Sequence, residues 1–334
     1  MLTEKIKIYI GETVGRVLKK DAEAFEFFRS DGRTLNMNAL LTHITVNYAD
    51  LFDEKEHEAA SFLRTQLPDI SLHDSELIAL CREMNTRFLT NAVDRKNAKT
   101  ACTISLKPTK ESAPVISYIE AHRLAGRSLS SYFRDMLTSY VSLPQDRREE
   151  IVFRESFAAL QKAISEKKRV FLTLKNGHIP QVTVSPYAIA RAKEEMHLYL
   201  LAASDKGASP IRLSRIISVT VLSEDAVFTE AQTAVFRKMQ EYGPQFIYRE
   251  WEGEVAVELT ERGEILFKKL YVHRPIPVSV EGRIYRFACS HTQIVQYFVR
   301  FGGEARVLYP RKVQNEILAF HQKAVRCLRD ANRT

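Results

Sequence analysis

The sequence predicts an α+β protein built from several domains. Three observations support this fold class: a strand–helix–turn–helix pattern that occurs twice in the N-terminal part, a helix followed by several short strands in the middle, and a strand–helix–strand–strand–helix–strand order towards the C-terminus. The chain has 334 residues, which is more than one ordinary hydrophobic core organises. We therefore expect about two to four domains.

The charge of the chain is unevenly distributed. Residues 1–98 contain 13 Lys and Arg against 16 Asp and Glu, and residues 99–150 contain 8 against 6. Residues 151–334 contain 28 Lys and Arg against 19 Asp and Glu, and the whole chain has a formal net charge of +8. A basic excess favours polyanions as partners. We therefore expect most of the affinity for nucleic acid in residues 151–334.

The first copy of the repeated pattern begins at the N-terminus. Residues 5–10 alternate polar and apolar side chains, which predicts a half-buried strand. Apolar residues at spacings of three and four between 14 and 28 predict a helix, and a second helix is expected from Met37. Between them, Gly32 is expected to end the first helix with a positive φ, and Thr34 to cap the second.

The second copy follows after a segment of different character. Residues 103–108 again alternate, a helix is expected from about 109 to 124, and another begins at Leu129 after a turn containing Gly126. Short single strands need a partner, so we expect the two strands to pair with each other. Residues from about 53 to 95 are interpreted as a helical insert.

The order strand, helix, Gly-Arg-[Thr/Ser] turn, helix resembles the ribbon–helix–helix fold of bacterial repressors. The resemblance implies a tandem, pseudo-dimeric ribbon-helix-helix region over residues 1–143, whose antiparallel ribbon enters the DNA major groove. The inward side chains would be Ile6, Ile8, Ile10, Ile104 and Leu106. The outward face would contain Lys5, Lys7, Tyr9, Thr103, Ser105 and Lys107. The alternative is a dimerisation scaffold without groove contacts, because these side chains are weaker base readers than Arg or Asn.

The middle of the chain predicts a small β-structure. Residues 144–153 begin with Pro144 and are crowded with charge, so they are interpreted as a linker. A short helix with Phe157, Leu160 and Ile164 on one face comes next. Strands are then expected at 170–174, 181–184, 197–202 and 211–219. A helix followed by short strands and turns is typical of a small barrel.

Three motifs in this region resemble those of a WYL domain: Ser185-Pro186-Tyr187, Leu198-Tyr199-Leu200 and Arg212-Leu213-Ser214-Arg215-Ile216. Leu198 stands where the family has Trp, and Ser214 where it has Asp. The resemblance implies an Sm-like β-barrel over residues 154–224, which binds nucleic acid or a nucleotide-like effector in a basic pocket.

The candidate contacts to nucleic acid in this domain are Tyr199, Arg212, Arg215, His197 and Arg191. An arginine can grip a phosphate and stack on a base, and a tyrosine ring offers a stacking face. On one continuous strand, Arg212 and Arg215 would point to opposite faces. Two alternatives stay open: Tyr199 is a buried structural residue, or one of the two arginines forms an ion pair with Glu194 or Glu195.

The C-terminal part predicts a strand at 255–259, a helix at 261–270 capped by Thr260, a hairpin of 276–280 with 283–288, a helix at 293–301 and a strand at 305–308. This βαββαβ order is that of a ferredoxin-like unit. The motifs Phe301-Gly302-Gly303 and Val307-Leu308-Tyr309-Pro310 are similar to the C-terminal extension of WYL proteins, which would cover residues 225–334. The terminal helix at 312–329 is amphipathic and could pack within a subunit or between subunits. A homodimer through the C-terminal half is expected.

No motif of a catalyst is present: the sequence lacks a P-loop, GxGxxG, HExxH and GxSxG. Its four cysteines, Cys81, Cys102, Cys289 and Cys327, form no CxxC pair, so we expect no metal site and no disulfide framework. No catalytic residue and no cofactor are predicted. The N-terminus does not read as a signal peptide and no apolar run is long enough to span a membrane, which predicts a cytoplasmic protein.

The whole arrangement resembles the WYL accessory proteins of type VI-D CRISPR systems, with the insert unmatched. The resemblance implies a non-enzymatic regulator that binds single-stranded RNA and stimulates an RNA-guided CRISPR nuclease supplied as a separate protein. The alternative is a ligand-responsive ribbon-helix-helix repressor that binds DNA through the ribbon. Outward Arg or Asn on both strands would favour the repressor, and Thr103 and Ser105 do not.

Overall fold

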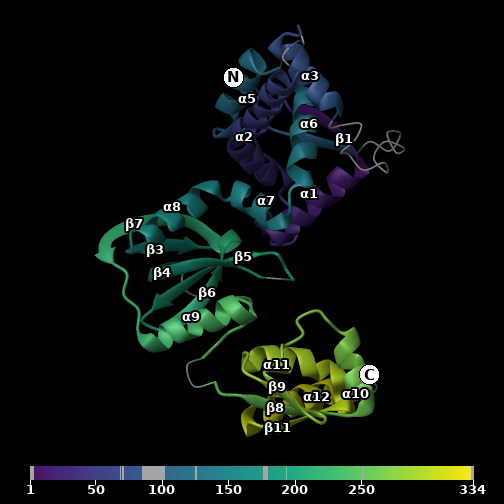
Figure 1. Cartoon of the computed structure of the whole chain (residues 1–334), viewed down its shortest axis with the longest axis vertical. Coiled ribbons are helices and arrows are strands. Elements are labelled where there is room, and N and C mark those ends of the chain that lie inside the picture. The colour runs from purple at the N-terminus through teal and green to yellow at the C-terminus, as the bar shows by residue number, and fades with distance from the viewer. Residues whose placement is uncertain are drawn as a thin grey trace. The chain divides into compact units, whose positions relative to one another are not determined.

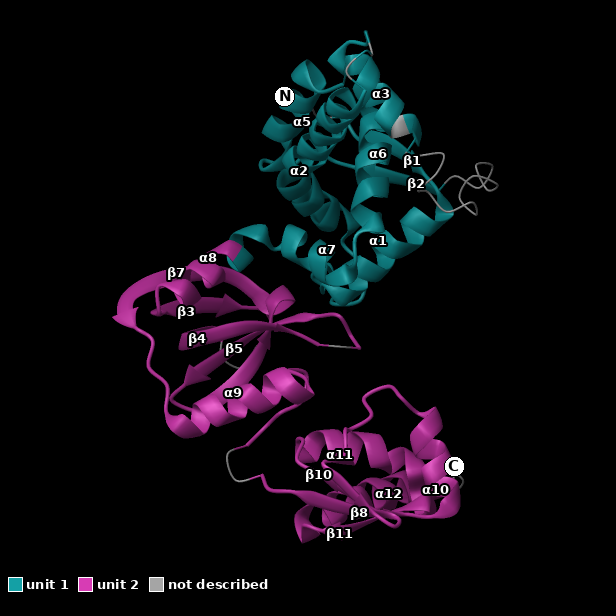
Figure 2. Cartoon of the chain, viewed as in Figure 1, with its two compact units in different colours: residues 1–157 teal, residues 158–334 magenta. Residues whose placement is uncertain are grey.

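The computed structural model divides into two compact units, residues 1–157 and residues 158–334 (Figure 2). The residues that it describes are 4–67, 69, 71–84, 102–124, 126–175, 180–192, 194–249 and 252–331. Helices occur together with a two-stranded, a four-stranded and a five-stranded sheet (Figure 1). This mixed architecture agrees with the predicted α+β class.

The first unit combines a two-stranded ribbon with helices. Its elements are β1 (Ile6–Ile10), α1 (Glu12–Ala24), α2 (Met37–Gln66), α3 (Asp74–Met84), β2 (Cys102–Leu106), α5 (Ser112–His122), α6 (Leu129–Ser142) and α7 (Gln145–Val152). β1 and β2 pair antiparallel with Ile8 opposite Ile104, which confirms the predicted pairing. α2 runs on through residue 53, where the insert was expected to begin. Residues 85–95 of that insert lie outside the described residues.

The core of the first unit forms where the ribbon meets the helices. Ile8 and Leu106 are buried under the ribbon, while Tyr48 of α2 and Tyr140 of α6 are fully buried with ring centroids 5.8 Å apart. The alternating strands supply one apolar face, and the helices supply apolar side chains at spacings of three and four. The apolar side chains of the alternating strands and those of the helices therefore pack into one shared core.

The end of α1 and the cap of α2 differ from the prediction. α1 ends at Ala24 instead of continuing to Phe28, because Glu26 adopts a φ of 59° and lets both Phe25 and Phe27 become buried. Asn36, not Thr34, caps α2, and its side chain accepts a hydrogen bond from Ala39 N at 3.1 Å. Gly32 has the predicted positive φ of 64°, but it lies in the loop after the helix has ended.

The stretch predicted as a linker, residues 144–153, forms helix α7 and packs within the first unit. Arg148 is buried and places two nitrogens 2.7 and 2.8 Å from the carboxylate of Asp21, which is fully buried in α1. Tyr140 donates a further hydrogen bond to Asp21 at 3.2 Å. The interpretation as a linker does not hold for α7, because this helix belongs to the first unit and the charge of Arg148 is paired inside it.

The second unit begins with an open sheet flanked by helices. Its elements are α8 (Arg154–Ser165, which crosses the boundary between the units), β3 (Lys168–Leu174), β4 (Gln181–Arg191), β5 (Leu198–Ser204), β6 (Gly207–Arg212), η2 (Leu213–Arg215), β7 (Ile216–Asp225) and α9 (Glu230–Tyr242). The strand order is β6-β5-β4-β3-β7. α9 covers part of β5, where Phe236 packs near Leu201 and Ala203.

Two predictions for this sheet are corrected. The expected single strand at 211–219 is two strands, because the 3-10 turn Leu213–Arg215 separates β6 from β7. These two strands lie at opposite edges of the sheet and, among the described residues, no pairing joins them. The sheet is therefore open where a closed barrel was expected.

The C-terminal body of the second unit contains β8 (Val255–Leu259), α10 (Glu261–Lys269), β9 (Ser279–Glu281), β10 (Ile284–Phe287), α11 (His291–Phe298), η3 (Val299–Glu304), β11 (Ala305–Tyr309) and α12 (Arg311–Ala331). The predicted element order βαββαβ is confirmed, and the strands are arranged β11-β8-β10-β9. The helices bury Phe267, Phe287, Phe298 and Phe301 in one core. Thr260 caps α10 as predicted and accepts from Gly263 N at 3.0 Å.

A glycine sets how closely α10 approaches the chain before β11. A Cβ added at Gly263 would lie 2.2 Å from the carbonyl oxygen of Glu304. Gly263→Ala should therefore lower the free energy of unfolding by about 1–3 kcal/mol or more, as overpacking does. Urea unfolding of the full chain measures the loss. Gly303→Ala is the matched control, since nothing lies within 4 Å of its added Cβ. Equal stability of the two variants would contradict the close approach.

Candidate nucleic-acid interface

The outward face of the ribbon is exposed along both strands. Lys7 lies opposite Ser105, and Tyr9 opposite Thr103. All four side chains are exposed, and so are Lys5 and Lys107 at the ends of the strands. Exposure along the ribbon therefore alternates with the sequence, with Ile8, Ile10 and Leu106 buried on the other face. Tyr9 is 53% exposed and adds an aromatic side chain to this face.

The second helix of each repeat begins beside the ribbon. Asn38, in the first turn of α2, donates to Lys107 O at 3.1 Å and accepts from Lys107 N at 2.7 Å. Ser130, in the first turn of α6, donates to Lys7 O at 2.8 Å. A helix N-terminus carries partial positive charge. The ribbon is thus flanked by the positive ends of two helices, which adds to the charge of its lysines.

Tyr199, His197 and Arg212 come together in the five-stranded sheet. Tyr199 is paired with Arg212 of β6 across the ladder, so their side chains lie on the same face. Arg212 Nη2 lies 2.8 Å from His197 Nε2. Arg212 and His197 are half-buried, whereas Tyr199 is only 7% exposed. In this conformation Arg212 and His197 are more exposed to solvent than Tyr199.

The other two predicted contacts lie elsewhere. Arg191 is exposed at the end of β4 and is paired with Leu198, so its side chain lies on the face opposite to Tyr199. Arg215 lies in the 3-10 turn η2 and is exposed, and its carbonyl oxygen accepts a hydrogen bond from Lys175 N at 2.8 Å. The argument that Arg212 and Arg215 share one strand therefore does not apply.

The two acidic residues at the end of this hairpin also have partners. Glu195 accepts a hydrogen bond from the Tyr199 hydroxyl at 3.4 Å. Glu194 lies 2.9 Å from Nδ1 of His273, and its other carboxylate oxygen accepts from His273 N at 2.9 Å. Glu195 thus fixes the buried ring of Tyr199, which agrees with a structural contribution of this tyrosine.

Within the described ranges, no cluster of three or more His, Cys, Asp and Glu side chains is arranged to hold a metal ion. No described helix is both long enough and apolar enough to cross a membrane.

Comparisons with known proteins give one informative likeness. No protein-family model matches the chain, and no curated protein matches its sequence. Among solved structures, a proteasome accessory factor B/C (PafBC) of Arthrobacter aurescens is 18% identical and aligns over 64% of this chain and 35% of its own, with a TM-score of only 0.25. A CRISPR Cas-related protein is 17% identical, with a TM-score of 0.64 over 99% of this chain and 95% of that one. The chain therefore shares its fold with that protein over nearly its full length.

Proposed function

We propose that the protein is a non-enzymatic regulator that binds single-stranded RNA and stimulates an RNA-guided RNA nuclease of a CRISPR system. The observation that carries the proposal is the shared fold, over almost the whole of both chains, with a CRISPR Cas-related protein. A fold shared over the whole chain is more specific than a likeness of one module, because modules recur in unrelated functions.

The architecture supports this proposal in three parts. We assign residues 1–143 to a tandem ribbon-helix-helix region, since two strand–helix–helix repeats share one ribbon. We assign residues 154–224 to a WYL domain, in which a helix precedes five strands that form an open sheet in the order β6-β5-β4-β3-β7. We assign residues 225–334 to a ferredoxin-like extension with the order β11-β8-β10-β9.

The RNA interface is proposed at the edge of the five-stranded sheet where β4 and β6 end and β5 begins. His197 and Arg212 form its centre, Arg215 lies beyond the end of β6, and Arg191 extends it on the other face. Tyr199, which is buried and paired with Arg212 across the ladder, contributes as part of the scaffold instead of stacking on a base itself. The basic excess of residues 151–334, with 28 Lys and Arg against 19 Asp and Glu, supports the placement.

The nuclease assay tests the regulatory step. Adding the chain to a guide-loaded type VI-D nuclease should increase the rate of target-RNA cleavage, and the chain alone should cleave nothing. A variant with Arg212→Ala and Arg215→Ala should stimulate less at the same concentration. An unchanged cleavage rate over a range of concentrations that saturates RNA binding would overturn the proposed stimulation.

The exposed ribbon favours a second candidate function, a ligand-responsive repressor that binds DNA. Its outward side chains include Lys7 and Tyr9, and the α2 and α6 N-termini lie beside it. In that case the ribbon would contact the major groove, and duplex DNA would be preferred over single-stranded RNA. The preference between these two nucleic acids therefore separates the candidates.

We also propose that the protein is a homodimer through α12. Val313 and Ile317 pack on the C-terminal core, but further along the helix Phe320 and Leu328 are exposed. The apolar stripe of α12 continues beyond the part of the helix that packs on the core. A second copy of the same helix can cover this exposed part. Phe320→Glu should convert the dimer to a monomer in light scattering, and Gln322→Glu, on the same helix, should not. A monomer already in the unsubstituted chain would refute this interface.

A further inference from the structure

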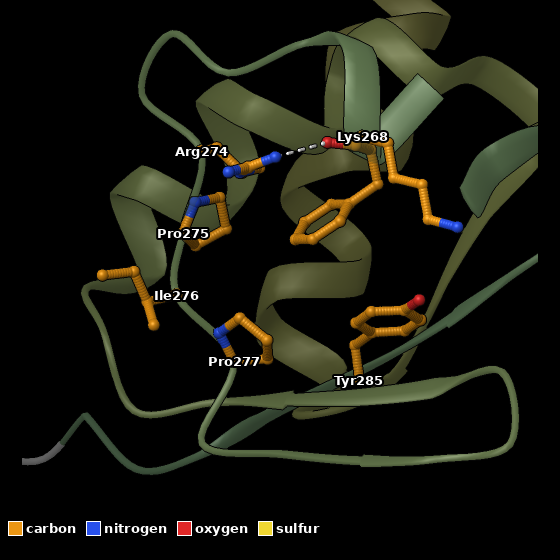
Figure 3. A pocket seen from close by; sticks show the side chains of 7 residues that line it. Lys268, Arg274, Pro275, Ile276, Pro277 and Tyr285 are labelled. Atoms are coloured by element: carbon orange, nitrogen blue, oxygen red, sulfur yellow. Dashed lines mark hydrogen bonds between the residues drawn. The ribbon is translucent and has the colours of Figure 1, made fainter. Parts of the chain in front are cut away.

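A pocket of about 350 Å³ lies in the C-terminal body, away from the residues that the sequence singled out. It is lined by Phe267, Lys268, Arg274, Pro275, Ile276, Pro277 and Tyr285. Figure 3 shows Pro275 and Pro277 on one side and Tyr285 across from them. The volume lies in the range of small-molecule sites, about 300–1,000 Å³.

One wall of the pocket is aromatic and held by the core. Phe267 is buried, and its ring centroid lies 5.2 Å from that of Tyr285. Phe267 is also stacked on Phe298 with an interplanar angle of 5°. The Tyr285 hydroxyl donates to Glu264 at 3.2 Å, which fixes this ring as well. Both rings therefore keep their positions without a ligand.

The opposite wall is a proline segment whose backbone is tied to the same core. Arg274 donates to Phe267 O at 3.3 Å. Just before it, Arg300 donates to Val272 O at 3.1 Å and Gln293 to His273 O at 3.3 Å. A proline has no backbone N–H, so this wall offers ring faces and not hydrogen-bond donors. The pocket is thus a preformed slot between flat apolar surfaces.

The charged lining residues are both basic. Arg274 lies with its guanidinium carbon 5.6 Å from the Phe267 ring centroid, and Lys268 is exposed at the end of α10. The lining contains no Asp or Glu. A guanidinium has five N–H donors, so its one bond to the Phe267 carbonyl leaves capacity for an anion. The ligand that fits is flat, apolar on its faces and negatively charged at one end.

We propose that this slot takes up one unstacked nucleobase and that Lys268 and Arg274 meet its phosphate. Bases that leave the stack are commonly held between aromatic and apolar side chains with a cation at the backbone. The base comes either from a free nucleotide or from a single strand. The inference rests on the proposed function only for the second source, because a free nucleotide needs no RNA interface.

Calorimetry with the full chain tests the site directly. AMP should bind, and ribose 5-phosphate, which lacks the base, should bind at least about tenfold more weakly. Ile276→Asp places a carboxylate in the slot and should raise the Kd for AMP about tenfold or more. Ile276 is 61% exposed, so this change spares the core. Val278→Asp is the control, since Val278 is exposed on the same segment but does not line the pocket.

A second pair of variants tests the phosphate contact. Lys268 and Lys269 are adjacent, exposed and equally charged, but only Lys268 lines the pocket. Lys268→Ala should weaken AMP binding about fivefold, and Lys269→Ala should leave it within about twofold. Equal losses in the two variants would mean a general charge effect and would overturn the assignment of Lys268.

Cross-linking of 4-thiouridine-labelled single-stranded RNA to the full chain identifies the source of the base. Cross-links in residues 267–286 that AMP competes away support a base from the strand, and AMP binding without such cross-links supports a free nucleotide. Absence of both overturns the pocket, while RNA binding elsewhere keeps the proposed function. AMP binding in a chain that binds no RNA keeps the pocket and refutes the proposed function.

Discussion

Replacing Arg148 by Ala should lower the free energy of unfolding by about 3–5 kcal/mol, because it leaves a buried charge without its partner. Arg148 makes two contacts of 2.7 and 2.8 Å to the Asp21 carboxylate, whose residue is fully buried. Burial and the nearby Asp21 raise the pKa of Tyr140 well above its usual value, so its hydroxyl stays protonated and keeps its hydrogen bond to Asp21. This neutral group carries no positive charge that could replace the guanidinium. The loss should be seen in urea unfolding of the full chain.

The neighbouring arginine provides the matched control. Arg147 pairs with Glu150 at 2.7 Å, but its side chain is 65% exposed. A solvated pair of this kind contributes about 0–1 kcal/mol, so Arg147→Ala should leave the unfolding midpoint nearly unchanged. Hydrogen exchange should show the loss from Arg148→Ala in α1 and α7. A small effect of Arg148→Ala would contradict a buried ion pair between α7 and α1.

Replacing Arg212 and Arg215 together by Ala should weaken single-stranded RNA binding about a hundredfold or more, since each charge-assisted contact contributes about 1.5–3 kcal/mol. Arg212 lies at the end of β6 beside His197, and Arg215 is exposed two residues after Leu213 in the following turn. Fluorescence anisotropy at one fixed salt concentration measures the change.

Stability and affinity must be measured on the same variant. Arg262→Ala removes one exposed charge from α10, outside the proposed interface, and should change RNA affinity by less than about threefold. If the arginines at 212 and 215 only support the sheet, their double variant will lose stability while its folded fraction binds RNA as before. That result would assign both side chains to the scaffold and leave the interface to other residues.

Sequence periodicity predicted those parts of the fold in which local pattern and tertiary burial agree. The alternation around Ile8 and Ile104 identified both strands, and their pairing followed because a lone strand needs a partner. The cap at Thr260 and the turn at Gly282, which has a φ of 60°, were also predicted from the residues next to them in the sequence. These features depend on residues close in sequence, so one sequence is enough to find them.

The errors arose where distant contacts decide the local structure. The charged stretch at 144–153 has no strong apolar pattern, and its helix joins the first unit through distant contacts such as the ion pair of Arg148 with the buried Asp21. Nothing in the run 211–219 marks the turn that separates β6 from β7. The pocket depends on Pro277 meeting Tyr285 across the fold, which spacing along the chain does not encode. One sequence signal was missed: Thr229 and Gln232 have the spacing of a capping box, and in the structure they form one at the start of α9.

A competition titration tests the central claim most directly. Single-stranded RNA and duplex DNA of equal length and matched sequence are added to the full chain at several salt concentrations. We predict preferential binding of the single-stranded RNA, with affinity falling by about 0.7 log unit per tenfold increase in salt for each phosphate neutralised. Tighter binding of duplex DNA, or RNA binding that does not depend on salt, would contradict the account.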